Sequence, residues 1–251
     1  MEMTKVLTGA VTNNLLRYFV VSGIFFLIFY VLFKNQWKNK KLQLKFPKLK
    51  DYQREIVYSM ITIAIFGIVA VMVFGTPLRQ YTQAYPNISD YGWGYWILSI
   101  VLMLVVHDTY FYWMHRLMHA PKLFKYVHLI HHKSTNPSPW ASYAFHPIEG
   151  FVEAGIIFPI AFLIPFHRTA LFTFLAIMIV YNVYGHLGFE LYPKGFNKTW
   201  IGKWINTSVN HNQHHKKFTG NYGLYFLWWD RWMGTLREDY DEAFAVADAK
   251  R

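Results

Sequence analysis

The stretch His107–His132 reads HDTYFYWMHRLMHAPKLFKYVHLIHH and holds six of the twelve histidines in this chain of 251 residues. His115 and His119 are four residues apart, so on a helix they lie on one face. A second group follows at the helical spacing i, i+3, i+4: His128, His131 and His132. Neutral imidazole is a good ligand for iron and zinc, so the stretch predicts a metal site to which two helices contribute.

The spacing HxxHH recurs downstream at His211, His214 and His215. A single histidine is usually a polar residue at a helix end, satisfied by a hydrogen bond. Here, however, all twelve histidines lie between residues 107 and 215, and three groups of them have ligand spacing. The eight imidazoles of these groups exceed what one ion needs, which favours a site for two metal ions.

The motifs HRLMH, HLIHH and HNQHH, in this order, resemble those of the fatty acid hydroxylase/sterol desaturase superfamily of membrane di-iron enzymes. The resemblance covers roughly Asp108 to Asp239 and includes ASYAFHPIEG at 141–150, GHLGFE at 185–190 and WDRWMGTLRED at 229–239. The residues of the motifs AFHPIEG and GTLRED are most similar to those of the sterol C-5 desaturase branch. The first hundred residues resemble only a generic membrane anchor.

This resemblance implies two non-haem iron ions, dioxygen as oxidant, and hydroxylation or desaturation of a C–H bond in a sterol-like or acyl lipid. It implies nine metal ligands: His115, His119, His128, His131, His132, His186, His211, His214 and His215. Gly185 and Gly188 flank the ninth ligand, His186, where a backbone without bulk would let the ring approach a metal. The chain shows neither a GxGxxG fingerprint nor a haem motif, so an external electron donor, a separate reductase or electron carrier, is expected.

Other polar residues of the matched region are expected around the ligand set. Metal-bound imidazoles usually donate their second N–H to an oxygen, and the candidates for this role are Asp108, Glu149 and Asp230. An ion pair with Arg116 or Arg231 is an equally good interpretation of any one of them. His146 matches the family pattern but stands alone, which suggests an outer or substrate-side position. His107 is expected to neighbour the site, and His167 to be a structural residue of a distant loop.

Composition indicates a membrane protein. The chain is 54% hydrophobic and 20% aromatic with only 16% charged residues, and its mean hydropathy is +0.14. It has no cysteine, which excludes disulfides and thiolate metal ligands within it. The net charge of +11 does not indicate a nucleic-acid partner, because the lysines adjoin apolar spans. The seven lysines of Lys34–Lys50 instead predict a cytoplasmic loop.

The apolar runs predict an all-α integral membrane protein with about four to five membrane-embedded helices and a cytoplasmic helical cap that carries the dimetal site. Leu15–Phe33, with Arg17 near one end, and Ile56–Gly75 would form an anchor hairpin. Tyr95–His119 would be about 37 Å long as a helix. The later runs, 151–166 and 170–184, are short for a crossing, so they fit either two spans or a re-entrant hairpin. Either way the chain returns to the side it left, which places all histidine motifs on the cytoplasmic face.

We therefore expect a membrane anchor over residues 1–94, a catalytic domain over 95–239 and a solvated tail over 240–251. The alternative function is a histidine-rich membrane metal transporter or sensor without redox catalysis. Transporters place ionisable residues at mid-membrane, whereas these histidines are predicted at helix ends. A third interpretation is a structural membrane protein with a metal-stapled cap.

Overall fold

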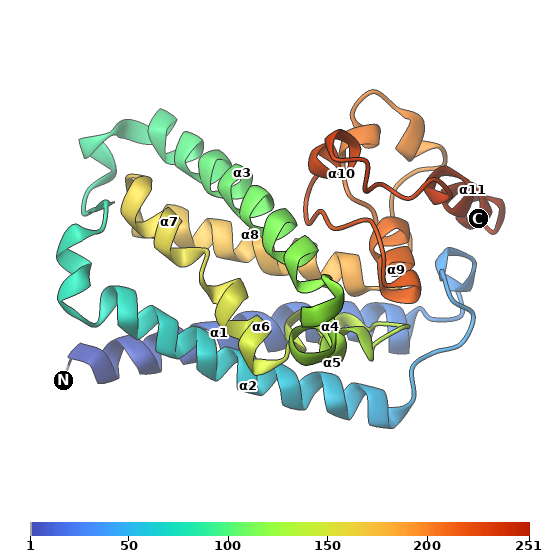
Figure 1. The fold of residues 1–251 in the computed structure, drawn as a ribbon, viewed down its shortest axis with the longest axis horizontal. Helices are drawn as coiled ribbons and strands as arrows, with labels where there is room; N and C mark the ends of the chain where they lie inside the picture. Colours follow the sequence, from blue (N-terminus) through green and yellow to red (C-terminus); the bar gives the residue numbers. More distant parts are fainter. Residues whose placement is uncertain (1) are drawn as a thin grey trace.

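The computed structural model describes residues 2–251, and their regular structure is almost entirely helical. Four helical segments are long and apolar enough to cross a membrane: Glu2–Leu32, Leu49–Phe74, Gly92–Met118 and Arg168–His186. Two short apolar helices, α6 (Pro147–Ala154) and α7 (Ile157–Leu163), pack among them (Figure 1). The predicted all-α membrane architecture is thus confirmed.

The first two helices, α1 (Glu2–Phe26) and α2 (Leu49–Phe74), run antiparallel along one side of the molecule (Figure 1). The first span starts well before the predicted Leu15 and continues from α1 into a π-helical segment, Leu27–Leu32. Its polar residues do not break it, because side chains such as Asn13 donate to a carbonyl one turn earlier, at 2.9 Å. As a consequence Arg17 lies near the middle of the helical span and not near its end, as the sequence had suggested.

The third long helix, α3 (Gly92–Met118), carries the first histidine pair as predicted. It has 27 residues, which corresponds to a length of about 40 Å, and His119 caps its C-terminus. Pro121 then opens α4 (Pro121–Val127), because proline suits the first turn of a helix. α5 (Leu129–His132) follows directly and completes the HLIHH motif.

Between α5 and the last long helix, the chain crosses the bundle in two pieces. α6 and α7 are separated at Gly155, where a Cβ would come within 2.5 Å of the Tyr110 hydroxyl. After α7, β2 (Phe166–His167) pairs in parallel with β1 (Ala84–Tyr85), which lies in the connection between α2 and α3. α8 (Arg168–His186) then returns to the histidine end. The apolar segment therefore reaches the far end of the bundle before it turns back.

The remaining helices form a cap over the histidine end: α9 (Ser208–Lys217), α10 (Trp228–Trp232) and α11 (Tyr240–Ala249) (Figure 1). Residues 240–251 differ from the expected solvated tail, because the side chains of Tyr240 and Phe244 are buried against Val209 and Leu227. Short 3-10 helices occupy the connections: Lys38–Lys40, Pro77–Tyr81, Ile88–Asp90, Pro139–Tyr143, Phe196–Lys198 and Gly202–Trp204.

Buried hydrogen bonds join the anchor to the loop that follows HLIHH. Glu55 of α2 accepts from the hydroxyl of Ser134 at 2.7 Å and from that of Ser138. Tyr18 of α1 donates to the carbonyl of Trp140 at 2.8 Å. The first two helices are thereby tied to the segment that directly follows the HLIHH motif.

Candidate metal centre

The nine histidines predicted as ligands lie together in two neighbouring groups. Cluster A consists of His115, His119, His128, His132 and His214, and cluster B of His131, His186, His211 and His215. Within each cluster, one ring nitrogen per residue lies within 4.8 Å of the others. All nine residues are buried except His119, which is partly exposed.

Each HxxHH motif divides its histidines between the two clusters. Neighbours in a helix point roughly 100° apart at 3.6 residues per turn. His131 therefore faces cluster B and His132 cluster A, and likewise His214 faces cluster A and His215 cluster B. The two clusters are consequently adjacent: the rings of His132 and His215 are 4.9 Å apart between centroids.

The donor set of cluster B fits a metal ion. His186 Nε2 lies 3.0 Å from Nε2 of His211, 3.2 Å from that of His215 and 3.3 Å from that of His131. Its Nδ1 donates to the carbonyl of Asn182 at 2.8 Å, which leaves a lone pair on Nε2 of the neutral ring. A ring nitrogen that carried a hydrogen could not bond three others at once, whereas lone pairs that converge on one point suit ligands of a shared cation.

Cluster A contains two similarly close pairs of ring nitrogens. His115 Nε2 lies 3.0 Å from His128 Nε2, and His132 Nε2 lies 3.1 Å from His119 Nε2. Metal–imidazole bonds are about 2.0–2.1 Å long for zinc, so two ligands at a right angle would have nitrogens roughly 3.0 Å apart. His214 Nε2 is buried and has no hydrogen-bond partner among residues 2–251. The observed separations therefore suit neighbouring ligands of one ion.

Hydrogen bonds on the outer side of the rings fix their tautomers. His115 Nδ1 donates to the carbonyl of Tyr222 at 2.9 Å, and His214 Nδ1 to that of Gly220 at 2.7 Å. Both acceptors belong to the turn after α9, in which Phe218 and Asn221 have φ values of 65° and 58°. This turn holds the two rings so that Nε2 faces cluster A.

His128 differs because its Nδ1 faces a carboxyl group. Glu149 Oε1 lies 2.6 Å away, and both side chains are buried. Burial lowers the pKa of His128 strongly, and the neighbouring imidazoles lower it further. Burial also raises the pKa of Glu149. Without a cation both groups are biased toward their neutral forms, whereas a cation at Nε2 would favour His128 donating to an ionised Glu149.

This region of the chain matches a known family. Residues 100–235, which include all nine histidines, match the family model described as fatty acid hydroxylase. The chain belongs to the fatty acid hydroxylase family.

Relatives within the family support the predicted branch. The chain is 32% identical over 226 residues to the Delta(7)-sterol 5(6)-desaturase ERG3B of Gibberella zeae, covering 90% of this chain and 67% of that protein. It is 33% identical over 198 residues to lathosterol oxidase of Rattus norvegicus, covering 77% and 64%. The predicted sterol desaturase branch is thus confirmed, and the chain spans about two thirds of the length of these relatives. No solved structure matches the chain.

In this member of the fatty acid hydroxylase family, Asp108 and Asp230 bind backbone and not imidazole. Asp108 accepts from the N–H groups of residues 225 and 226 at 2.7 and 3.2 Å. Asp230 accepts from those of residues 222 and 223 at 2.9 and 2.8 Å. Asp230 thereby holds the segment whose Tyr222 carbonyl receives the His115 hydrogen bond. Of the three predicted carboxylates, only Glu149 contacts an imidazole directly.

The three remaining histidines lie outside both clusters. His146 caps α6: its Nδ1 accepts from the N–H of Ile148 at 3.3 Å, and its own N–H donates to Glu149 at 3.4 Å. It therefore helps to orient Glu149. His107 is a buried neighbour of the site, as expected, with Nδ1 2.9 Å from the Tyr225 hydroxyl. His167 lies in the distant loop, where Nε2 donates to the Pro86 carbonyl at 3.1 Å.

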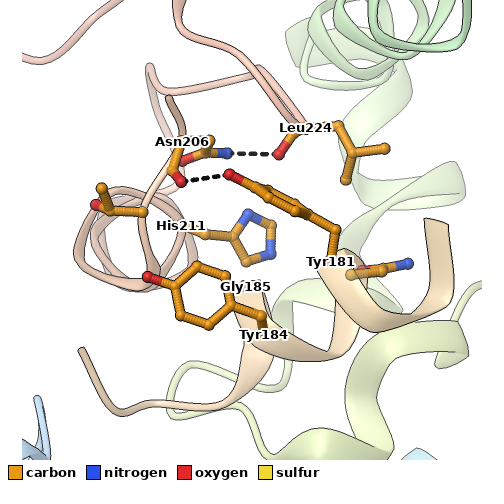
Figure 2. Close-up of a pocket in the computed structure, with 8 residues that line it drawn as sticks. Tyr181, Tyr184, Gly185, Asn206, His211 and Leu224 are labelled. Carbon is orange, nitrogen blue, oxygen red and sulfur yellow. Dashed lines mark hydrogen bonds between the residues drawn. The ribbon is translucent and has the colours of Figure 1, made fainter. Parts of the chain in front are cut away.

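Gly185 was expected to give space to the ring of His186, but it gives space to the ring of His211. A Cβ at this position would lie 3.4 Å from Cδ2 of His211, so the missing side chain lets α9 approach α8. Figure 2 shows the His211 ring beside Gly185, between the rings of Tyr181 and Tyr184, next to a cavity of about 10 Å³. The flanking Gly188 has a φ of +72°, a conformation that favours glycine.

Glu190 of the GHLGFE segment helps to position α9, a role that the sequence pattern did not predict. It accepts from the Tyr184 hydroxyl at 2.8 Å and from the N–H of Val209 at 3.1 Å, in the first turn of α9. Burial raises its pKa. The carboxyl thus links the end of α8 to the start of the helix that carries HNQHH.

Lys41 belongs to the lysine-rich segment that was predicted as a cytoplasmic loop, and its side chain is only 1% exposed. Its Nζ lies 4.7 Å from the ring centroid of Phe46, 5.0 Å from that of Phe189 and 5.4 Å from that of Tyr30. Burial lowers the pKa of Lys41 to about 8. The aromatic residues around the loop, which interact favourably with a cation, explain why it folds inward.

Proposed function

We propose that this protein is a membrane-bound, dioxygen-dependent di-iron oxidoreductase that desaturates or hydroxylates a sterol-like lipid. The observation that carries the proposal is the pair of histidine clusters with converging Nε2 atoms. The sterol class follows from the relatives named above, and desaturation is the outcome that their names favour.

The nine clustered histidines would hold the metal ions, five in cluster A and four in cluster B. Iron suits an all-imidazole donor set and, unlike zinc, changes redox state; when bound it would supply the activation of dioxygen. Glu149 would keep the proton of His128 on Nδ1, and the carbonyls of Tyr222 and Gly220 would do the same for His115 and His214. These contacts hold the rings while the buried surroundings exclude water.

The proposed reaction needs an external reductant. In desaturation, two hydrogen atoms leave adjacent carbons of the lipid, and these together with two electrons and two protons reduce dioxygen to two water molecules. In hydroxylation, one oxygen atom enters a C–H bond and the other leaves as water, with the same requirement for electrons and protons. A separate reductase or electron-carrier protein would supply the electrons.

The site would face the cytoplasm. The lysine-rich segment Lys34–Lys50 follows the first span, and basic residues favour the cytoplasmic side. The end of α8 that carries His186 lies beside this segment, because Leu42 N–H donates to the Gly188 carbonyl at 2.9 Å.

The test is to express the protein in a sterol-containing host and to compare lipid extracts by mass spectrometry. We expect a sterol that has lost two hydrogen atoms; a sterol that has gained one oxygen atom would indicate hydroxylation. The matched control is His186→Ala, which should give neither product. An unchanged lipid profile from iron-loaded, folded protein supplied with reductant would contradict the proposal and favour the metal-binding alternative.

A further inference from the structure

The cap carries an exposed aromatic surface beside α3. Five large apolar side chains form this surface, which we call the aromatic edge: Trp200, Ile201, Trp204, Trp232 and Met233. Trp200 is 80% exposed and Trp232 is 63% exposed. Exposed apolar patches of this kind usually mark a contact with a partner or a membrane.

Two segments of the cap build the aromatic edge: the connection that contains the 3-10 helix Gly202–Trp204, and α10 with the residue that follows it. Leu227 N–H donates to the Trp204 carbonyl at 2.8 Å, and Arg231 Nε donates to the Lys203 carbonyl at 2.7 Å. The Arg231 guanidinium also lies 5.8 Å from the ring centroid of Trp204. The two segments are therefore packed together as one surface.

α10 lies against the last turns of α3 (Figure 1). Trp229 Nε1 donates to Oγ1 of Thr109 at 3.2 Å, and its ring centroid is 5.6 Å from that of Trp113. Thr109 and Trp113 follow the exposed Val105 at a spacing of four residues, so they continue the lipid-facing stripe of α3. Trp232 in turn lies 5.5 Å from Trp229. The aromatic edge thus adjoins the surface that α3 presents to lipid.

Trp113 also indicates the level of the membrane surface. Trp93, at the other end of α3, is exposed as well, and 20 residues separate the two tryptophans, about 30 Å along the helix. This length equals the thickness of the hydrocarbon core, and tryptophan is enriched at both of its boundaries. Trp113 therefore lies at the boundary on the histidine side, and α10 lies beside it.

Positive charge accompanies the aromatic edge. Lys198 is exposed, and Lys203 and Arg231 are partly exposed. Among residues 2–251, none of these three side chains forms an ion pair. Tryptophan together with unpaired basic residues suits the headgroup region of a membrane that contains anionic lipids.

Nearby acidic residues do not cancel this charge. Residues 191–229 contain neither Asp nor Glu. Asp230 of α10 is buried and accepts hydrogen bonds from the N–H groups of residues 222 and 223. Asp241 of α11 accepts from the side-chain amide of Asn197 at 2.7 Å, and the three basic residues outnumber it. The surface therefore keeps a net positive charge.

We propose that the aromatic edge lies in the headgroup region of the leaflet on the histidine side and binds anionic phospholipids there. Lys198, Lys203 and Arg231 are the partners of the lipid phosphate and carboxylate groups. The cap is thereby held against the membrane by its own surface as well as by the spanning helices. This inference goes beyond the proposed function, since it requires neither metal nor turnover.

Spin labelling of the full chain, in nanodiscs that hold one chain each, tests the position of the aromatic edge. Collisions of each label with oxygen and with a water-soluble nickel chelate give its depth in the bilayer. We expect Ile201→Cys and Met233→Cys to report a depth of about 5–10 Å, as is usual for interfacial apolar surfaces. Val101→Cys on the lipid-facing side of α3 is the reference for a deeper position, and Val246→Cys on α11 is the reference for exposure to water.

A surface that instead pairs with a second copy or with a soluble protein would stay accessible to water in these nanodiscs. Collision ratios equal to that of Val246→Cys would therefore overturn the proposal.

A fluorophore at Ile201→Cys, with doxyl-labelled lipids as quenchers, tests the preference for anionic headgroups. Phosphatidylserine should bind about fivefold more tightly than phosphatidylcholine, the effect of one basic residue near a membrane surface. Lys198→Gln/Lys203→Gln should remove most of this preference. Lys216→Gln/Lys217→Gln, at exposed lysines of α9 outside the aromatic edge, is the matched control and should retain it. Equal binding of the two lipids, or an unchanged preference in the folded Lys198→Gln/Lys203→Gln variant, would overturn the proposal.

Discussion

Glu149 Oε1 lies 2.6 Å from Nδ1 of His128, and both side chains are buried. This contact joins α6, which packs among the spanning helices, to the junction of α4 and α5 in cluster A. It is the one direct contact between a carboxyl group and a clustered imidazole among residues 2–251.

Glu149→Gln should weaken metal binding in cluster A. The amide has no negative charge to stabilise the Nδ1–H of a metal-bound His128, and loss of such outer partners typically lowers metal affinity about 10- to 100-fold. Competition with a chelator would measure the change. Glu238→Gln, at an exposed position, is the control, and equal affinities for the two variants would contradict the role assigned to Glu149.

His186→Ala should lower bound metal from two ions per chain to about one. His186 Nε2 contacts three other ring nitrogens of cluster B, whereas cluster A keeps all of its histidines. Elemental analysis of purified, iron-loaded protein gives the ratio. His167→Ala serves as the control: it removes a helix cap at the far end of the bundle, at a cost of about 1 kcal/mol, and should retain both ions. Full metal content in the His186 variant would exclude this residue as a ligand.

The chain should place Lys38 and Lys217 on the same, cytoplasmic, side and Gln80 on the other. All three residues are exposed, and the chain contains no cysteine, so single cysteines can be introduced at each position without background. A membrane-impermeant maleimide added to intact cells should label only the Gln80→Cys variant. Labelling of Lys38→Cys and Lys217→Cys from opposite sides would be incompatible with one shared metal centre.

The metal-free protein should lose stability in mild acid. Burial lowers the pKa of six clustered histidines outside the spanning helices: His128, His131, His132, His211, His214 and His215. In the unfolded chain their pKa values return to about 6.5. Below that pH the unfolded state binds more protons than the folded state, so the free energy of unfolding falls as pH falls, until the folded-state pKa values are reached.

Each of these histidines contributes about 1.4 kcal/mol to this loss at pH 5.5, one unit below its unfolded pKa. Thermal unfolding in detergent should therefore give a Tm that is constant between about pH 8 and 7 and decreases below about pH 6.5. Bound metal should shift the decrease to lower pH, because it stabilises the folded state. A Tm that does not change between pH 7 and 5.5 would contradict the burial of neutral imidazoles.

Spacing of four residues predicts a shared helix face, and the pairs His115/His119, His128/His132 and His211/His215 each lie within one cluster. It did not predict which cluster His186 joins, since this residue reaches His131 only through the packing of α8 against the rest of the bundle. It also missed Glu190 and Lys41, whose burial depends on contacts with segments distant in sequence.

The membrane spans show the same limit. The hydropathy pattern predicted all four long helices, but it predicted that the first one starts at Leu15. Hydropathy takes no account of hydrogen bonds such as the one that the Asn13 side chain donates within its own helix, which begins at Glu2. The buried tail could have been inferred from the chain itself: Tyr240, Phe244 and Ala247 recur at helical spacing and form the face that packs against α9.

The bonds from Glu55 to Ser134 and Ser138 bear on how this protein can be handled. A fragment that starts after the anchor would leave both hydroxyls and the Trp140 carbonyl without the buried partners they have in the intact chain. Trimming the first two helices to obtain a water-soluble enzyme should therefore yield insoluble or unfolded material. Purification and biochemical work require the whole chain in detergent or lipid, even though every clustered histidine lies outside the region that would be removed.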